Sequence, residues 1–161
     1  MPAYSIGIDL GTTHSCVAVL IDGEVVIVPN EQGSKTTPSF VAYRGDAPTV
    51  GGAAQNSITQ NPTGTIYDAK RLIGKKFSDA SVQKDIEMWP FKVEADEHDN
   101  PVIVAVFKDK DDNKIEKRLS PTEISSFILK NLKERAGKYL KQEVKHAVIT
   151  VPAYFNEEQR E

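Results

Sequence analysis

The clearest candidate for chemistry is the short stretch "DLGTT" at residues 9–13, which follows an apolar run near the start of the chain. A tight turn at Gly11 can direct the backbone N–H groups of residues 11–13 toward one anion, and the two threonine hydroxyls add donors. Asp9, at the end of the preceding strand, can hold Mg²⁺ through water, because this ion gives up its hydration shell reluctantly. The stretch therefore predicts a site for a polyphosphate and its metal ion; a polar hairpin turn without a ligand is the alternative.

A second candidate group is Lys70, in the stretch "DAKRLIG". Its ammonium group is a point charge on a flexible stem, which suits a terminal phosphate; a solvated helix residue is the alternative. The sequence contains neither the G-x-x-x-x-G-K-[ST] pattern of a P-loop nor the G-x-G-x-x-G pattern of dinucleotide-binding folds. A phosphate site in this chain must therefore be built on another kind of turn.

The composition is that of an ordinary globular protein, with 39% hydrophobic and 27% charged residues among 161. A chain of this length fits one domain, which buries roughly 70% of its unfolded surface. The net charge of −3 gives no sign of nucleic acid or a membrane as the main partner. Cys16 is the single cysteine, which excludes an internal disulfide. We expect a protein of the cytoplasm or of another reducing compartment, since the sequence shows no leader and no apolar run of membrane-spanning length.

The strand that holds Asp9 is predicted over residues 5–9. Ile6 and Ile8 share one face of it, and Gly7 predicts close packing on the other. Near the other end of the chain, the stretch "HAVITV" predicts a strand buried on both faces, because it is almost entirely aliphatic.

Two further strands are predicted within residues 16–28, joined by Asp22-Gly23, a pair that tolerates positive φ and is typical of hairpins. Another strand is expected at 38–44. The N-terminal part would then form an antiparallel meander, with residues 11–13 as its first turn. From residue 90 onward, three more strand signals predict a second meander.

The clearest helix signal begins at Ser120, which can cap the helix, with Glu123 three residues later to complete a capping box. Its expected buried face consists of Ile124, Phe127, Ile128, Leu132, Ala136 and Tyr139. Shorter helices are predicted at 66–74 and 79–89. Asn156 can cap a last helix, and the sequence ends about one turn into it, as we expect of a truncated chain.

Together these stretches closely resemble the N-terminal part of the 70-kilodalton heat-shock chaperones. The resemblance is carried by "IGIDLGTTHSCVAV", "TTPSFVAY", "NPTGTIYDAKRLIGKKF", "WPF" and "AVITVPAYFNEEQR". It implies an α/β chain with the actin-like ATPase (ribonuclease H-like) fold, of which this chain holds the first lobe only, a mixed sheet with flanking helices. The inner subdomain would comprise about 1–39 and 120–161, and the outer subdomain about 40–119.

The resemblance implies that the parent protein is an ATP-dependent folding chaperone that hydrolyses ATP to ADP and phosphate. Its small ligands would be ATP or ADP and Mg²⁺, with K⁺ as a further candidate ion. Its partners would be unfolded client peptides, J-domain co-chaperones and nucleotide-exchange factors, with no nucleic acid and no membrane. Because a nucleotide cleft needs two walls, we expect this chain alone to bind ATP weakly and to hydrolyse it negligibly.

The resemblance also implies roles for single residues. Asp9 would lie at the Mg²⁺ and its waters, and Gly11, Thr12 and Thr13 would form the first phosphate loop. Lys70 matches the catalytic lysine of the family, which helps to place the attacking water and stabilises the transferred charge.

Pro152 and Arg160 match a pair that relays the nucleotide state to the peptide-binding domain. Tyr154 and Phe155 also match the family, and we expect both to pack in the interior, as we do for Trp89.

The sequence departs from the family pattern in a few places. At His14 the family has a tyrosine or a small polar residue, and we expect the histidine to lie in a surface turn. Gly52, Gln55 and Ser57 stand where the family has an acid, a base and a glutamine. These differences weaken any inference about the contacts of the outer subdomain.

Two other functions remain open at this point. The first is a sugar or carboxylate kinase of the same superfamily, which also places an acid and a glycine turn after its first strand. The second is a non-enzymatic interaction module built from half of an ATPase domain.

Overall fold

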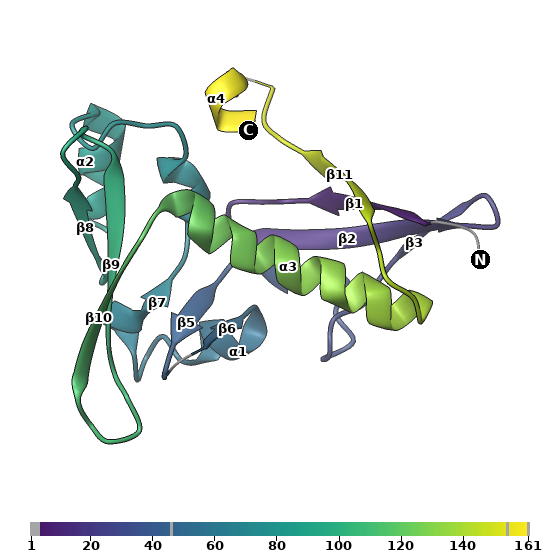
Figure 1. The fold of residues 1–161 in the computed structure, drawn as a ribbon, viewed down its shortest axis with the longest axis horizontal. Helices are drawn as coiled ribbons and strands as arrows, with labels where there is room; N and C mark the ends of the chain where they lie inside the picture. Colours follow the sequence, from purple (N-terminus) through teal and green to yellow (C-terminus); the bar gives the residue numbers. More distant parts are fainter. Residues whose placement is uncertain (1–3, 46, 154, 161) are drawn as a thin grey trace.

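The computed structural model describes residues 4–45, 47–153 and 155–160, which form three sheets arranged along one long helix (Figure 1). The first sheet is mixed, with the order β11-β1-β2-β3 and with β4 paired to β2. Its strands are β1 (Ser5–Asp9), β2 (His14–Ile21), β3 (Glu24–Ile27), β4 (Thr37–Pro38) and β11 (His146–Thr150). Strand β1 runs antiparallel to β2 and parallel to β11, so segments from both ends of the chain meet in this sheet.

Two smaller antiparallel sheets lie at the other end of the molecule (Figure 1). They have the strand orders β6-β5-β7 and β10-β9-β8. Their strands are β5 (Val41–Tyr43), β6 (Pro48–Val50), β7 (Thr65–Ile66), β8 (Lys92–Ala95), β9 (Pro101–Lys108) and β10 (Lys114–Leu119). The second meander expected from the sequence is confirmed as β8–β10.

The strand expected at 38–44 is divided between two sheets, which corrects the predicted extent of the first meander. Residues Thr37–Pro38 pair with β2, whereas Val41–Tyr43 pair with β6 and β7. Pro38 has no backbone N–H and cannot continue a hydrogen-bonded ladder. The chain therefore leaves the first sheet here and enters the second.

The helices are α1 (Gly52–Asn56), α2 (Ala80–Ile86), α3 (Pro121–Leu140) and α4 (Glu157–Arg160), with 3-10 turns η1 (Pro62–Gly64) and η2 (Ala69–Leu72). The helix expected around Lys70 is therefore a single 3-10 turn that follows the short strand β7. Among the described residues, no helix is both long enough and apolar enough to cross a membrane.

Helix α3 begins as the sequence predicts. The Ser120 hydroxyl accepts a hydrogen bond from the Glu123 amide (3.1 Å), and the Glu123 carboxylate accepts one from the Ser120 amide (2.7 Å). The buried positions of the helix include Ile124, Ile128, Leu132 and Ala136. Tyr139 was expected on this face but is 46% exposed, because it lies near the end of the helix.

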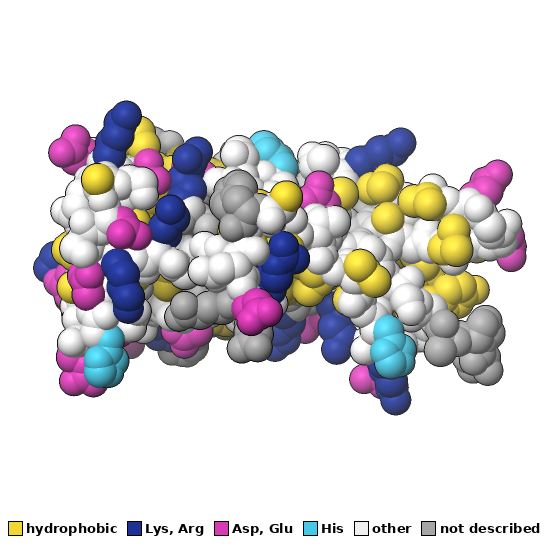
Figure 2. Space-filling model, turned by 90° about the horizontal axis from the view of Figure 1, so that it is seen from above, with side chains coloured by type: hydrophobic (Ala, Val, Ile, Leu, Met, Phe, Trp, Pro, Cys, Tyr) yellow, Lys and Arg dark blue, Asp and Glu magenta, His cyan; other side chains and the backbone are white. Residues whose placement is uncertain are grey.

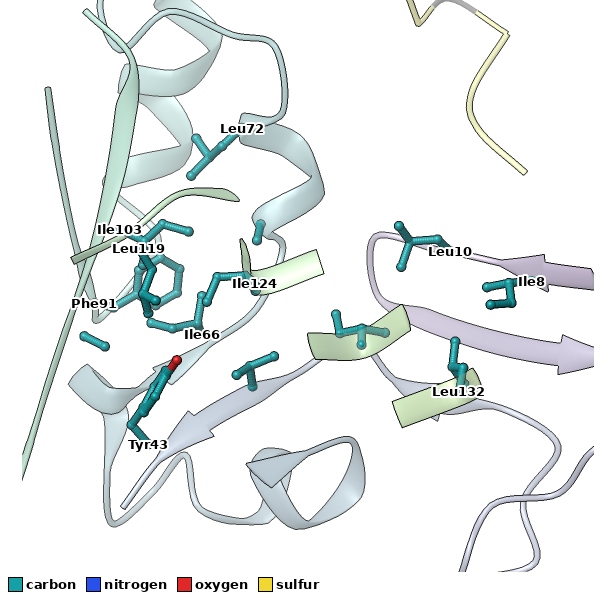
Figure 3. Packing of buried hydrophobic residues seen from close by; sticks show 14 of the residues in the cluster. Ile8, Leu10, Tyr43, Ile66, Leu72, Phe91, Ile103, Leu119, Ile124 and Leu132 are labelled. Carbon is teal, nitrogen blue, oxygen red and sulfur yellow. The ribbon is translucent and has the colours of Figure 1, made fainter. Parts of the chain in front are cut away.

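The hydrophobic core is one continuous cluster that follows α3 from the first sheet to the outer sheets (Figure 3). Ile8, Leu10 and Leu132 lie at the end near the first sheet, whereas Ile124 and Ile66 lie between the helix and the outer sheets (Figure 3). Because α3 contacts β1, β2 and η2, it fixes the turn between β1 and β2 relative to η2.

The two faces of the first sheet differ, as the exposure of β1 shows. Ile6 and Ile8 are buried toward α3, as predicted. On the other face a side chain added at Gly7 would have no atom within 4 Å, so the close packing expected there is wrong for the described residues. Strand β11, at the edge of the sheet, is exposed at every position. The prediction that this strand is buried on both faces is therefore wrong for the described residues. Hydrophobic side chains consequently gather on the surface of this half of the molecule (Figure 2).

Candidate functional site

The turn between β1 and β2 is tight, and Gly11 is the residue that makes it possible. A Cβ atom added at Gly11 would lie 1.9 Å from the carbonyl oxygen of His14, much closer than any real contact. The backbone of His14 occupies the space that a side chain at Gly11 would need, so only glycine fits. The sequence prediction of a tight first turn is confirmed.

The amide and the carbonyl of Gly11 are both hydrogen-bonded to other groups of the protein. Its amide donates to the Ser15 hydroxyl (3.2 Å), and its carbonyl accepts from the Ser39 hydroxyl (2.8 Å). The Ser39 amide also donates to the Thr13 carbonyl (2.8 Å). The expectation that the Gly11 N–H faces an anion is therefore wrong, because this donor is already used inside the protein.

Thr12 and Thr13 supply the donors that remain. Within the part of the chain that the structure describes, their amides donate to no protein acceptor. Thr13 is exposed and Thr12 is half-buried. The turn can thus offer two backbone amides and two hydroxyls to a ligand outside.

Asp9 lies at the carboxyl end of β1, directly before the turn, and its side chain is exposed. The Thr150 hydroxyl, at the end of the neighbouring strand β11, donates to one carboxylate oxygen of Asp9 (2.9 Å). Cys16 is opposite Asp9 on β2. The bond from Thr150 orients the carboxylate and leaves lone pairs of its oxygens for a metal ion or its waters.

Lys70 lies beside the same turn, although it is 60 residues away in the sequence. Its ammonium group donates to the carbonyl of Leu10. Burial lowers the pKa of Lys70 below its usual value of 10.5, and the nearby carboxylate of Asp9 partly opposes this shift. The structure therefore brings Asp9, the turn and Lys70 together, as the resemblance implied.

The C-terminal segment reaches the same place through Phe155. The ammonium of Lys70 lies 5.8 Å from the centre of the buried Phe155 ring, within the range of a cation–π contact. The Phe155 amide donates to the Pro152 carbonyl (3.0 Å), and the Phe155 carbonyl accepts from Arg160 Nε (3.0 Å). Pro152 and Arg160 are thus linked to Lys70 through one residue. Tyr154 lies outside the described residues.

Helix α4 rests on the segment that follows η2. The Gln159 side chain donates to the carbonyl of Ile73 (2.9 Å). A Cβ atom at Gly74 would lie 2.2 Å from the Gln159 side chain, and the φ of 63° at Gly74 also favours glycine. Asn156 caps the helix as predicted, since its side chain accepts from the Gln159 amide (2.9 Å).

The ligand groups at the turn suit Mg²⁺ better than a metal ion that takes all its ligands from protein side chains. No cluster of three or more His, Cys, Asp or Glu side chains suited to a metal occurs among the described residues. Mg²⁺ commonly uses one or two carboxylates and takes its other ligands from water and phosphate. Asp9 with the hydroxyls of Thr12 and Thr13 matches this requirement.

The turn lies open at the surface, as one wall of a two-walled cleft would. Four of the cavities formed by the described residues lie elsewhere, and none of these four is lined by Asp9, by residues 11–13 or by Lys70. A ligand held by the turn would therefore keep much of its surface in water unless a second wall covered it.

The remaining singled-out residues have ordinary structural positions. His14 is exposed as expected, but it is the first residue of β2 and not part of the turn. Trp89 is buried and stacked on Phe91 with ring centres 5.2 Å apart, as expected. Ser57, one of the departures from the family pattern, is buried and bonds to Thr65 (3.1 Å).

Sequence reasoning missed Ser15, Ser39 and Thr150, which hold the turn and Asp9. Ser15 and Ser39 are 24 residues apart and form no recognised spacing. The one available signal was the hydroxyl-rich content of "GTTHS" and "TTPS", two stretches that the strand pairing brings together.

Comparison with known proteins identifies a family and several relatives of this chain. The family model described as Hsp70 protein matches residues 5–161. Heat shock cognate 70 kDa protein 3 of Dictyostelium discoideum is 51% identical over 158 residues, which is 98% of this chain and 24% of that protein. Heat shock 70 kDa protein 2 of Paracoccidioides lutzii is 49% identical over 159 residues, 99% of this chain and 23% of the relative.

A third relative has a name that states a role. It is a ribosome-associated molecular chaperone of Saccharomyces cerevisiae, 50% identical over 157 residues, which is 98% of this chain and 24% of that protein. The chain thus spans about a quarter of the length of these relatives and corresponds to their N-terminal part.

Proposed function

This chain belongs to the Hsp70 family, and from that premise we propose that it forms one wall of the ATP site in an ATP-dependent folding chaperone. The family's nucleotide-binding domain has the actin-like ATPase fold, and this α/β chain covers part of it. The membership favours the chaperone over the sugar or carboxylate kinase. We assign residues of about 1–39 and 120–161 to an inner subdomain and about 40–119 to an outer one.

The observation that supports the proposal is the meeting of three groups from distant parts of the sequence. Asp9 ends β1, the turn follows it, and the Lys70 ammonium donates to the carbonyl of Leu10 inside that turn. A carboxylate, a set of outward amides and hydroxyls, and a cation are the parts that a metal-bound triphosphate requires.

Each residue receives a role in this proposal. Thr12 and Thr13 bind phosphate oxygens through their amides and hydroxyls, while Gly11 keeps the turn tight. Asp9 holds the waters around Mg²⁺, and the ion itself neutralises charge on the phosphates when bound. Lys70 orients the attacking water and stabilises charge on the transferred phosphoryl group.

The desolvation of Lys70 supports this last role. A cation that is partly removed from water interacts more strongly with a developing negative charge, because the local dielectric constant is lower. Phe155 lies against the ammonium on one side and bonds to Pro152 and Arg160. These contacts support the proposal that Pro152 and Arg160 relay the nucleotide state.

The proposal extends to the whole protein. ATP hydrolysis would be coupled to binding and release of unfolded peptides, with J-domain co-chaperones and nucleotide-exchange factors as partners. K⁺ would be a second ion beside Mg²⁺. The setting would be the cytoplasm.

This chain by itself would bind Mg·ATP weakly, because a nucleotide cleft needs two walls. Micromolar affinity with steady turnover, measured by calorimetry, would contradict the need for a second wall.

The test uses the full-length protein that contains this chain. Asp9→Ala and Thr12→Ala should each weaken binding of Mg·ATP about tenfold or more, since each removes a group that contacts phosphate or its metal shell. Asp22→Ala is the matched control, because Asp22 is an acid in the turn at the opposite end of β2. Unchanged affinity in both site variants would refute the proposal.

A further inference from the structure

We propose that Ser15 and Ser39 are positioning residues that hold the phosphate-binding turn in one conformation through a closed ring of hydrogen bonds. The inference rests on the proposed function of the turn. Neither serine can touch a ligand bound on the outside of the turn, because both are almost fully buried, at 2% and 4% exposure. They act through the backbone of Gly11.

The direction of every bond in the ring follows from elementary donor counting. The carbonyl of Gly11 can only accept, so the Ser39 hydroxyl must donate to it (2.8 Å). A serine hydroxyl has one hydrogen, so in the contact between the two hydroxyls (2.9 Å) the donor is Ser15. Ser15 in turn accepts from the Gly11 amide (3.2 Å).

The result is a ring that begins and ends at Gly11: amide to Ser15, Ser15 to Ser39, and Ser39 to the carbonyl. Each hydroxyl in it both donates and accepts, so each bond polarises the next. The Ser39 amide adds a bond to the Thr13 carbonyl (2.8 Å), which holds the other end of the turn.

The ring has a consequence for ligand binding. It turns the Gly11 amide inward and so leaves the amides and hydroxyls of Thr12 and Thr13 as the outward donors. A site that is rigid before the ligand arrives loses less free energy in ordering than a loose one. The two serines would thus raise affinity for phosphate without contacting it.

Strand β4, which directly precedes Ser39, is held by a contact from the long helix. Arg135 on α3 donates to the hydroxyl of Thr37 (2.5 Å), and Thr37 pairs with Ser15 across β4 and β2. The serines therefore belong to a scaffold that includes α3.

The test compares Ser15→Ala and Ser39→Ala with Ser57→Ala in the full-length protein. Ser57 is the matched control: it is also a buried serine, 7% exposed, whose hydroxyl bonds to a carbonyl and to the hydroxyl of Thr65, but it lies far from the turn in sequence and outside the first sheet. All three variants should lose similar thermal stability, since each loses comparable buried hydrogen bonds.

The readouts that separate positioning from stability are ligand affinity and amide exchange. Ser15→Ala and Ser39→Ala should weaken Mg·ATP binding about tenfold, whereas adenosine binding should stay unchanged because it involves no phosphate. Ser57→Ala should leave both affinities unchanged. Hydrogen exchange of the Gly11 amide, read by NMR, should be slow in the wild type and at least about tenfold faster in Ser15→Ala.

Equal ATP affinities of Ser39→Ala and Ser57→Ala, relative to a wild type that binds ATP, would overturn the inference. If Ser39→Ala fails to fold, Ser39→Cys is the second variant, because a thiol has nearly the same shape as a hydroxyl and forms a weaker hydrogen bond. Ser39→Cys should show a smaller loss of ATP affinity, and an unchanged affinity would equally overturn the inference. A wild type that binds no Mg·ATP would instead refute the proposed function, and the Gly11 exchange rate would still test the ring.

Discussion

Gly11 and Gly7 lie four residues apart and have opposite surroundings. A side chain at Gly11 would meet the His14 carbonyl, whereas one at Gly7 would meet nothing. Gly11→Ala should therefore lower the free energy of unfolding by about 1–3 kcal/mol through overpacking. Gly7→Ala, the matched control, should raise it by about 0.5 kcal/mol, because alanine restricts the unfolded chain more than glycine does.

Denaturant unfolding of the two glycine variants measures both effects. An alanine at Gly11 that is tolerated as well as one at Gly7 would contradict the tight turn and with it the placement of Thr12 and Thr13.

The pKa of Lys70 provides a second test at the residue scale. Burial lowers this pKa below 10.5 and the Asp9 carboxylate partly restores it, so Asp9→Asn should lower the pKa of Lys70 further. NMR titration of the labelled lysine side chain measures the value. Asp22→Asn should leave the pKa of Lys70 unchanged, and a rise in Asp9→Asn would contradict the geometry.

The same shift predicts how stability depends on pH. Since the folded chain binds the Lys70 proton less tightly than the unfolded chain, the free energy of unfolding contributed by this group rises with pH, from the lowered pKa up to 10.5. Lys70→Met, which cannot titrate, should lack this rise.

At the scale of elements, the first turn of α3 is the most clearly encoded feature. Ser120→Ala removes one half of the capping box and should cost about 1 kcal/mol of stability. Ser126→Ala is the control, because Ser126 is exposed inside the same helix and its hydroxyl donates to the Glu123 carbonyl (2.7 Å). Urea unfolding compares the two; an equal loss would show that the cap contributes nothing specific.

Local patterns predicted those elements whose signal lies within a few residues. The β2–β3 hairpin forms at Asp22 and Gly23, with φ angles of 50° and 84°, as that pair requires. The division between β4 and β5 was missed, because a run of β-favouring residues does not tell which sheet each half joins. The exposure of β11 was missed for a related reason. A run of aliphatic residues indicates that a strand forms, but it does not show whether other elements pack on the faces of that strand.

The candidate site shows the same limit. Asp9 and the glycine turn are adjacent in sequence, so their chemistry could be read directly. Lys70 could be joined to them only through the family resemblance, because nothing local links residues 60 positions apart. Ser15 and Ser39 were not found at all, since their contact depends on how β4 pairs with β2.

At the scale of the molecule, the main feature is the open face of the first sheet. Leu20 (58% exposed), Val25 (71%) and Val148 (71%) lie exposed on this sheet, and Figure 2 shows hydrophobic side chains over this half. A contiguous apolar surface of this kind favours association in water. We expect the isolated chain to bind a hydrophobic dye such as ANS and to self-associate.

Two valine-to-threonine changes of equal shape test this expectation. Val25→Thr on the open face should reduce dye binding and self-association, and change stability by less than about 0.5 kcal/mol. Val17→Thr on the face toward α3, where the residue is 1% exposed, should cost roughly 1–3 kcal/mol by burying a hydroxyl. Light scattering and denaturant unfolding separate the two; a large loss of stability at Val25 would mean that this face is covered.

The most direct test of the central claim is single-turnover hydrolysis of ATP by the full-length protein carrying Lys70→Ala. The account predicts that Mg·ATP still binds within about tenfold of the wild-type affinity while the hydrolysis step slows by at least about a hundredfold, because Lys70 acts on the transferred charge. Lys84→Ala, an exposed lysine on α2, should behave as the wild type. A hydrolysis rate equal to that of the wild type in Lys70→Ala would contradict the account.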